Sequence, residues 1–178
     1  MIKQLLFSGH MIDSPNRETP RFPAERETQV RTALERVIES LEHPEFIEGI
    51  ASAAAGGDIL FLETCSKYQI PCRIYLPFET ELFGKESVNF ASGKWPERFK
   101  SVLQEFSVFI PEPGSATQNE NIYTLTNNLM IKEALKFPED EILLIAVWDG
   151  KKGDGGGGTW EMVDTCQKLG LAVEIIHP

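Results

Sequence analysis

The segment ASAAAGGDILFLE, residues 51–63, lies at the centre of what this sequence predicts. Small residues lead into the pair Gly56-Gly57, and an apolar run of helical length follows at once. Paired glycines between a strand and a helix let backbone N–H groups approach a ligand closely, and the N-terminus of the helix adds a partial positive charge. The segment is therefore typical of a phosphate-binding turn, and equally of a tight turn that holds no ligand.

Short apolar runs and helical patterns alternate on both sides of this segment. The apolar runs predict strands at residues 2–7, 46–51, 73–76, 107–110, 142–148 and 171–176. Apolar positions at helical spacing predict helices at 24–41, 57–68, 95–106, 119–136 and 159–169. The alternation predicts an α/β fold: a single Rossmann-like three-layer domain over residues 1–178, with a mostly parallel sheet and helices on both faces.

Three segments fit neither pattern. Residues 11–23 and 111–118 are rich in turn residues and are predicted as loops. Residues 79–93 are predicted as an irregular segment that forms a flap. A loop as long as 11–23 inside a compact domain is often functional.

The composition excludes several classes of protein. A net charge of −10 argues against a general nucleic-acid or anionic-membrane surface, which needs clustered Lys and Arg. Cys65, Cys72 and Cys166 form no CxxC pair and are interpreted as reduced, mostly buried thiols; with the scattered histidines they predict no metal site and no cofactor. No apolar run reaches the ~18 residues that cross a bilayer, and the N-terminal run is too short for a signal peptide. We therefore expect a cytoplasmic protein.

Small and polar residues follow three of the predicted strands. They are Ser8, Gly9 and His10; Gly56, Gly57 and Asp58; and Asp149 with the glycine-rich turn Gly156, Gly157, Gly158 and Thr159. The carboxyl ends of parallel strands lie on one edge of a sheet, so the three turns are expected to converge on a ligand. The turn at 156–159 is the most phosphate-like, because its glycines precede a helix that begins with a hydroxyl; the alternative is a flexible surface loop in which Thr159 is an ordinary N-cap.

Neither glycine turn matches a strict nucleotide fingerprint. The pattern GxGxxG is absent after the first strand, and GxxxxGK[ST] is absent from the chain. His10 is a candidate acid or base near neutral pH, but a structural or ligand-binding hydrogen bond is favoured because no nearby motif supplies a nucleophile. Arg17 and Arg21 are interpreted as solvated loop charges in preference to ligand contacts. Trp160 is the tryptophan best placed to contact a ligand, because it adjoins the glycine turn.

The sequence resembles the SLOG superfamily of Rossmann-like domains, which includes nucleoside-monophosphate phosphoribohydrolases and bacterial sensor domains. The residues that carry the resemblance are FSGHMID at 7–13, the run from 53 to 63 with GGDILFLE, and VWDG at 147–150 followed by GGGT at 156–159. The resemblance implies a pocket for a nucleotide or nucleotide-derived ligand, with its phosphate on the 156–159 turn. It also implies a protein effector as a partner, and homodimers are common in the resembled family, although no interface pattern is visible in this chain.

One position departs from the resembled hydrolases. Their second motif reads PGGxGTxxE with a catalytic glutamate, whereas this chain has Asp154 at the proline position and Met162 at the glutamate position. Glu161 lies one residue earlier, about 100° around the helix. The leading hypothesis is therefore a binding or sensing domain without catalysis.

Glu63 supports the second hypothesis, an enzyme that cleaves or transfers at an N-glycosidic bond, like a phosphoribohydrolase or a deoxyribosyltransferase. Glu63 lies in an apolar run, where an unpaired carboxylate is costly to bury. It is predicted either to contact the ligand, as a ribose-binding group or as nucleophile or base, or to face solvent or pair with a cation such as Lys67. Asp58 is predicted to contact the ligand or only to stabilise the first turn of its helix. A third hypothesis is an assembly scaffold with a vestigial pocket.

Overall fold

The computed structural model describes residues 1–112, 121–153 and 156–178. In these residues a six-stranded, wholly parallel sheet has the order β4-β3-β2-β1-β5-β6. The strands are β1 (Gln4–Gly9), β2 (Glu48–Ala51), β3 (Cys72–Tyr75), β4 (Ser107–Phe109), β5 (Ile142–Val147) and β6 (Ala172–Ile176). The predicted strands and their parallel arrangement are confirmed.

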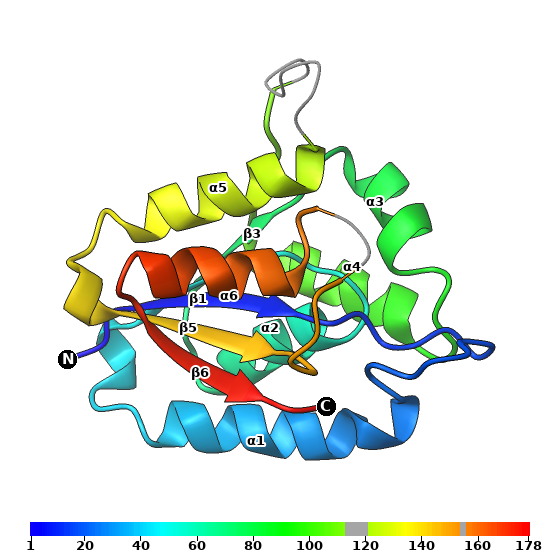
Figure 1. Cartoon of the computed structure of the whole chain (residues 1–178), viewed down its shortest axis with the longest axis horizontal. Helices are drawn as coiled ribbons and strands as arrows, with labels where there is room; N and C mark the ends of the chain where they lie inside the picture. The colour runs from blue at the N-terminus through cyan, green and yellow to red at the C-terminus, as the bar shows by residue number, and fades with distance from the viewer. Residues whose placement is uncertain (113–120, 154–155) are drawn as a thin grey trace.

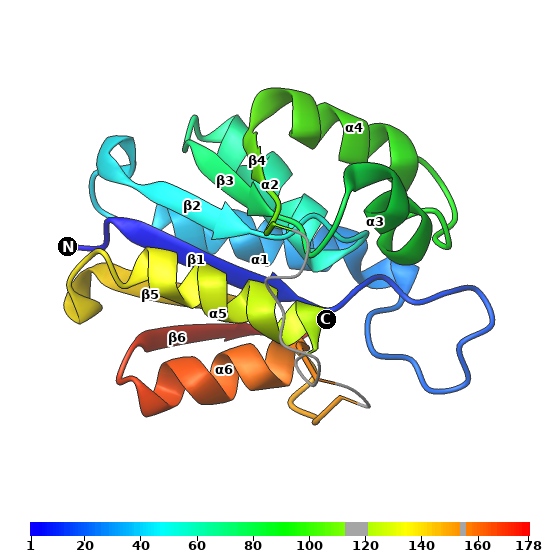
Figure 2. The same cartoon turned by 90° about the horizontal axis from the view of Figure 1, so that it is seen from above.

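Helices cover both faces of this sheet, as predicted. The helices are α1 (Glu27–Glu39), α2 (Gly57–Lys67), α3 (Thr80–Ser87), α4 (Trp95–Glu105), α5 (Ile122–Ala134) and α6 (Thr159–Lys168), with short 3-10 turns at Ala24–Arg26, Pro44–Phe46 and Glu139–Glu141. The apolar sides of α1, α2 and α4 pack into the core on one face, and those of α5 and α6 form a second core on the other. Figure 1 shows α5 above the sheet and α1 below it, and Figure 2 shows α2 and α4 apart from α5 and α6.

The prediction of an irregular flap at residues 79–93 is wrong in part, because this segment contains α3. This helix is short, and isolated helices of this length are unstable in water. Tertiary packing stabilises this helix. Phe83 is buried, and the centroid of its ring lies 5.8 Å from that of Phe99 on α4. Of the loop predicted at 111–118, residues 113–118 lie outside the described residues, as do residues 119 and 120 of the predicted helix.

The order of the strands places a crevice at the carboxyl ends of β1 and β5. From β1 the chain adds β2, β3 and β4 on one side, and β5 and β6 on the other. Figure 1 shows the strand arrows of β1, β5 and β6 ending at the same edge. Ligands of open parallel sheets bind where the strand order reverses, outside the carboxyl ends. None of the described helices has the length and apolar character needed to cross a membrane.

Candidate ligand-binding site

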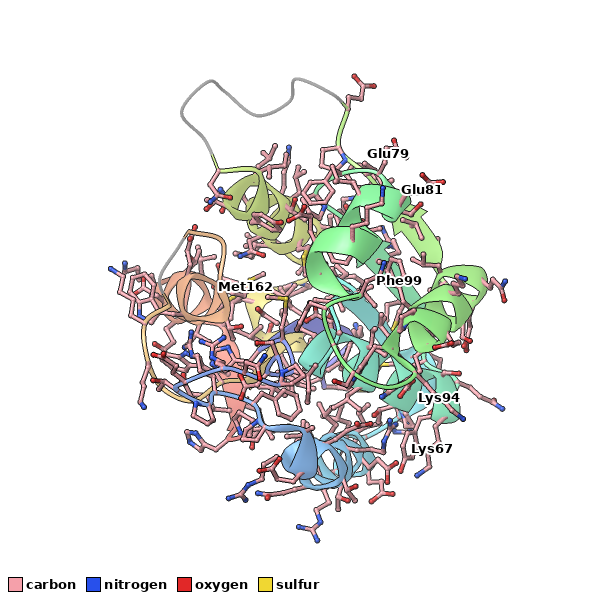
Figure 3. All side chains as sticks on the ribbon, turned by 90° about the vertical axis from the view of Figure 1, so that its right-hand side faces the viewer. Lys67, Glu79, Glu81, Lys94, Phe99 and Met162 are labelled. Atoms are coloured by element: carbon pink, nitrogen blue, oxygen red, sulfur yellow. The ribbon has the colours of Figure 1, made fainter. Side chains whose placement is uncertain are left out.

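A cavity of about 360 Å³ opens at this edge of the sheet. Figure 3 looks onto the edge, with α6 and Met162 on one side and α3 and α4, labelled at Glu81 and Phe99, on the other. The cavity is lined from β1, α2, α3, α5 and the start of α6. Of the predicted site residues, it brings together Ser8, Gly9, His10, Asp58, Gly156, Gly157, Gly158 and Thr159.

The start of α6 gives the cavity a polar wall. Gly158 is the N-cap of this helix, so Thr159 occupies its first turn and is not the N-cap. The hydroxyl of Ser8, at the end of β1, donates a hydrogen bond of 3.3 Å to Thr159 Oγ1. The first N–H groups of an α-helix have no acceptor within the helix and carry its partial positive charge. This wall is suited to oxygen atoms of a ligand.

The glycine turn before α6 is built against α5. Gly157 has a φ of +81°, and a Cβ at this position would lie 2.3 Å from Tyr123 Cβ. Asn127 Nδ2 donates to the Gly157 carbonyl at 2.9 Å, and Asn121 Nδ2 donates to the Gly156 carbonyl at 3.4 Å. The 156–158 part of the turn is therefore held in place, while Asp154 and Gly155 lie outside the described residues.

The polar residues that hold the turn, two asparagines and a threonine, were not predicted from the sequence. Asn121, Thr124 and Asn127 each contribute a hydrogen bond to the turn or to Glu161. Their spacing of three residues places them along one side of a helix. Polar residues at that spacing on a helix with several apolar positions were the available signal.

Gly56 and Gly57 do not line the cavity, and their assignment as ligand-binding residues stays a prediction. Gly56 forms an isolated antiparallel bridge with Met11, and the Gly57 N–H donates to the His10 carbonyl at 3.0 Å. A Cβ on Gly57 would lie 2.9 Å from the Cα of Gly9. The close backbone approach that the glycines permit is therefore used by the chain that follows β1, and the Gly57 N–H is already occupied.

Asp58 is a buried carboxyl group at the wall of the cavity. Its side chain is 6% exposed, and its Oδ2 accepts a hydrogen bond of 3.1 Å from the Ala54 N–H. Burial raises the pKa of Asp58 from 3.8 to about 7, although the N–H groups of Ala54 and Gly9 favour the ionised form and partly offset this. Near neutral pH, Asp58 can therefore donate or accept a hydrogen bond, depending on its proton.

His10, Asp149 and Arg21 form a cluster at the rim. Asp149 Oδ1 lies 2.9 Å from His10 Nε2 and 2.9 Å from Arg21 Nη2, while Arg21 Nε donates to Asp149 Oδ2 at 2.9 Å. Hydrogen bonds from Arg21 hold the pKa of Asp149 well below its usual range. Burial lowers the pKa of His10, against the hydrogen bond to Asp149, and so favours the neutral imidazole.

This cluster changes the interpretation of its members. Asp149 does not line the cavity: it positions His10 and Arg21, which do. The expectation that Arg21 is a solvated loop charge is wrong, because the bidentate pair with Asp149 fixes it at the rim. Arg17 also lines the cavity and donates from Nε to the Thr19 carbonyl at 2.8 Å.

Glu63 lies outside the cavity lining, and its role as a site residue stays a prediction. Its carboxylate accepts hydrogen bonds from Arg98 at 2.7 and 2.8 Å and from Arg31 at 2.6 Å. Burial alone would raise the pKa of Glu63, but these hydrogen bonds outweigh it and lower the pKa. The alternative that Glu63 pairs with a cation is confirmed, with arginines as partners; Lys67 pairs with Glu35 instead.

We expect Glu63→Ala to destabilise the protein by about 1–3 kcal/mol, because it removes the closer of the two carboxylates that Arg31 and Arg98 share and leaves them only Glu27. Urea denaturation measures the effect. Asp164→Ala is the matched control, because it removes an exposed ion pair with Lys168 that is worth at most ~1 kcal/mol. Equal losses in the two variants would show that the cluster around Glu63 has no structural role.

Met162 is buried in the core on the α6 side of the sheet. The position at which the resembled hydrolases carry a carboxylate is therefore apolar packing in this chain. Glu161, one residue earlier, lines the cavity instead. Among the described residues, no group of histidine, cysteine, aspartate and glutamate side chains could hold a metal ion.

The fold has counterparts among solved structures. DNA processing protein A from Streptococcus pneumoniae aligns with a TM-score of 0.58 at 10% sequence identity, over 99% of this chain and 51% of that chain. This similarity shows that the two proteins share a parallel α/β fold. The chain spans about half the length of this matched protein.

Two structures of the molybdenum cofactor carrier protein from Chlamydomonas reinhardtii align less well. Their TM-scores are 0.39 and 0.38 at 12% identity, over 98% of this chain and 89% of those chains. No protein-family model and no curated protein matches the sequence. The similarity to DNA processing protein A shows the fold alone.

Proposed function

We propose that the chain binds a nucleotide or nucleotide-derived small molecule in this cavity, without catalysis. The observation that carries the proposal is that the start of α6, the hydroxyls of Ser8 and Thr159, and the buried carboxyl of Asp58 all face one cavity of about 360 Å³. Ligand sites are typically concave, mostly apolar, and supplied with a few convergent polar groups. The volume lies at the small end of the usual ~300–1,000 Å³ range, which favours a ligand of mononucleotide size.

The walls of the cavity supply a place for each part of such a ligand. Helix N-termini bind phosphate oxygens, which assigns the phosphate to the first turn of α6. Tyr123 and Trp160 line the cavity and offer flat rings for a base. Asp58 and Asn127 offer hydrogen bonds for hydroxyl or amino groups.

Two positions in the chain support the absence of catalysis. Met162 occupies the glutamate position of the resembled hydrolases and is buried. Glu63, the carboxylate of the alternative hypothesis, is held by Arg31 and Arg98 outside the cavity lining. A non-catalytic binding domain acts through a partner, so the proposal includes a protein effector. A net charge of −10 favours a small molecule over nucleic acid as the ligand.

A thermal-shift series tests the proposal with nucleosides, nucleoside monophosphates and nucleotide sugars. A ligand at ~100 times its dissociation constant stabilises the native state by about 2.7 kcal/mol. We expect at least one nucleoside monophosphate or nucleotide sugar to raise the melting temperature. If every member leaves it unchanged, the binding proposal fails and the scaffold hypothesis gains support.

Two substitutions at Gly158 locate the binding. A Cβ at this cavity-lining residue meets no atom within 4 Å, and its φ of −85° suits any residue. Gly158→Ala and Gly158→Val both replace a favoured N-cap, but valine adds more bulk next to the proposed phosphate position. We expect a larger loss of affinity for valine than for alanine. Release of free base by the wild-type protein, measured in parallel, would contradict the non-catalytic part of the proposal.

A further inference from the structure

The carboxylate of Glu161 lies on the glycine turn that the sequence assigns to a phosphate. Glu161 is in the first turn of α6, and its side chain returns toward the N-terminus of the helix. Its Oε2 accepts a hydrogen bond of 2.6 Å from the Gly157 N–H and one of 3.3 Å from Thr124 Oγ1. Glu161 also lines the cavity. The protein's own Glu161 carboxylate therefore already occupies the N–H group of this turn that a phosphate oxygen would use.

This arrangement is related to a capping box, in which a glutamate in the first turn accepts from an N–H that precedes the helix. The negative charge of Glu161 also interacts favourably with the helix dipole. Both features are those that would otherwise attract a ligand phosphate to the same N–H groups. A phosphate oxygen at Gly157 would have to displace the carboxylate and would approach it as a like charge.

The other charges of the cavity do not compensate for Glu161. Among the described residues, Glu86 and Asp58 also line it, and Asp58 is partly protonated at neutral pH because its pKa is about 7. The cations among the described lining residues are Arg17 and Arg21; Arg17 pairs with Asp13, and the guanidinium of Arg21 is shared with Asp149. A ligand with several negative charges would therefore meet more repulsion than attraction.

We infer that Glu161 is a built-in competitor for the anion-binding turn, and that it makes the cavity selective for ligands with one phosphate over those with two or three. This inference rests on the proposed function, because it specifies the ligand class of the same cavity. The competitor is held by the protein backbone and by α5, so the selectivity is present before any ligand arrives. Removing its charge while keeping its shape removes the like-charge repulsion that a second phosphate would meet at the turn.

The test compares the wild-type protein with Glu161→Gln and Asp164→Asn, using inorganic pyrophosphate, nucleoside monophosphates and nucleoside diphosphates in calorimetric titrations. Glutamine keeps a carbonyl oxygen for the Gly157 N–H, so the turn stays folded. Asp164 is on the same helix but pairs with Lys168, and it controls for net charge. We expect Glu161→Gln to bind pyrophosphate and diphosphates about tenfold more tightly than the wild type, a change of about 1.4 kcal/mol. Monophosphates should change by less than about threefold.

Three results would overturn the inference: equal diphosphate affinity in wild type and Glu161→Gln, the same gain in Asp164→Asn, or no binding of pyrophosphate to Glu161→Gln. Failure of the proposed function has a different signature. In that case no nucleotide binds the wild-type protein, whereas pyrophosphate binding to Glu161→Gln still reports on the turn.

Discussion

Replacing Gly56 by valine is expected to lower the free energy of unfolding by at least ~3 kcal/mol, a large part of the ~5–15 kcal/mol that is typical of a folded domain. Gly56 has a φ of +124°, which a β-branched residue cannot adopt without strain. Its Cβ would lie 2.4 Å from the Ile12 nitrogen and 2.7 Å from the His10 carbonyl oxygen. These are backbone atoms of the segment that borders the cavity, so they cannot move aside without displacing that segment.

Urea denaturation followed by circular dichroism measures this loss. Gly158→Ala is the control, because that residue has an ordinary φ and open space around its Cβ position. We expect the control to lose less than ~1 kcal/mol. If Gly56→Val unfolds within ~1 kcal/mol of the wild type, the structural role assigned to the glycine pair is wrong.

Asp58 is expected to make the protein less stable as the pH rises from about 4 to 7. The pKa of Asp58 is raised by burial to about 7 in the folded protein, against 3.8 for the exposed group. Between these values the folded state binds more protons than the unfolded state, so the free energy of unfolding falls as the pH increases. This difference between the folded and unfolded pKa values lowers the free energy of unfolding above pH 7 by an amount on the order of 4 kcal/mol.

Asp58→Asn isolates this effect, because asparagine has the same shape and does not titrate. We expect the difference in unfolding free energy between variant and wild type to grow in favour of the variant from pH 4 to 7 and to be constant above pH 8. The offset between them also contains the altered hydrogen bond from the Gly9 N–H, so the slope is the informative quantity. The lowered pKa of His10 acts in the opposite direction in wild type and variant alike and cancels in the difference. Parallel curves for the two proteins would show that Asp58 titrates normally.

The fold was largely predictable because its signals are local. The apolar run of β5 marks a strand buried on both faces, and the alternation of strands and helices implies parallel pairing. Convergence of the Ser8 and Thr159 turns followed from the geometry of a parallel sheet. Helix α3 was not predictable, because it depends on the contact of Phe83 with a later helix.

The details of the site depended on contacts between residues far apart in the sequence. A Gly-Gly pair indicates close approach but not its partner, and here the partner of Gly56 is the backbone near Met11. Glu63 pairs with arginines 32 and 35 residues away, which a search along its own helix cannot find. The contact of Glu161 with Gly157 was also not predicted, because the resembled motif carries its carboxylate one residue later, at the position of Met162.

The most direct test of the account is an NMR titration of the ¹⁵N-labelled protein with the nucleotide that gives the largest thermal shift. If the cavity at the carboxyl ends of β1 and β5 is the binding site, the amide signals of Ser8, Gly158 and Thr159 shift with one common dissociation constant. The signals of Arg31 and Glu63, which lie outside the cavity lining, stay in place. Shifts confined to residues outside the cavity, or no saturable shift at Gly158 and Thr159, would contradict the account.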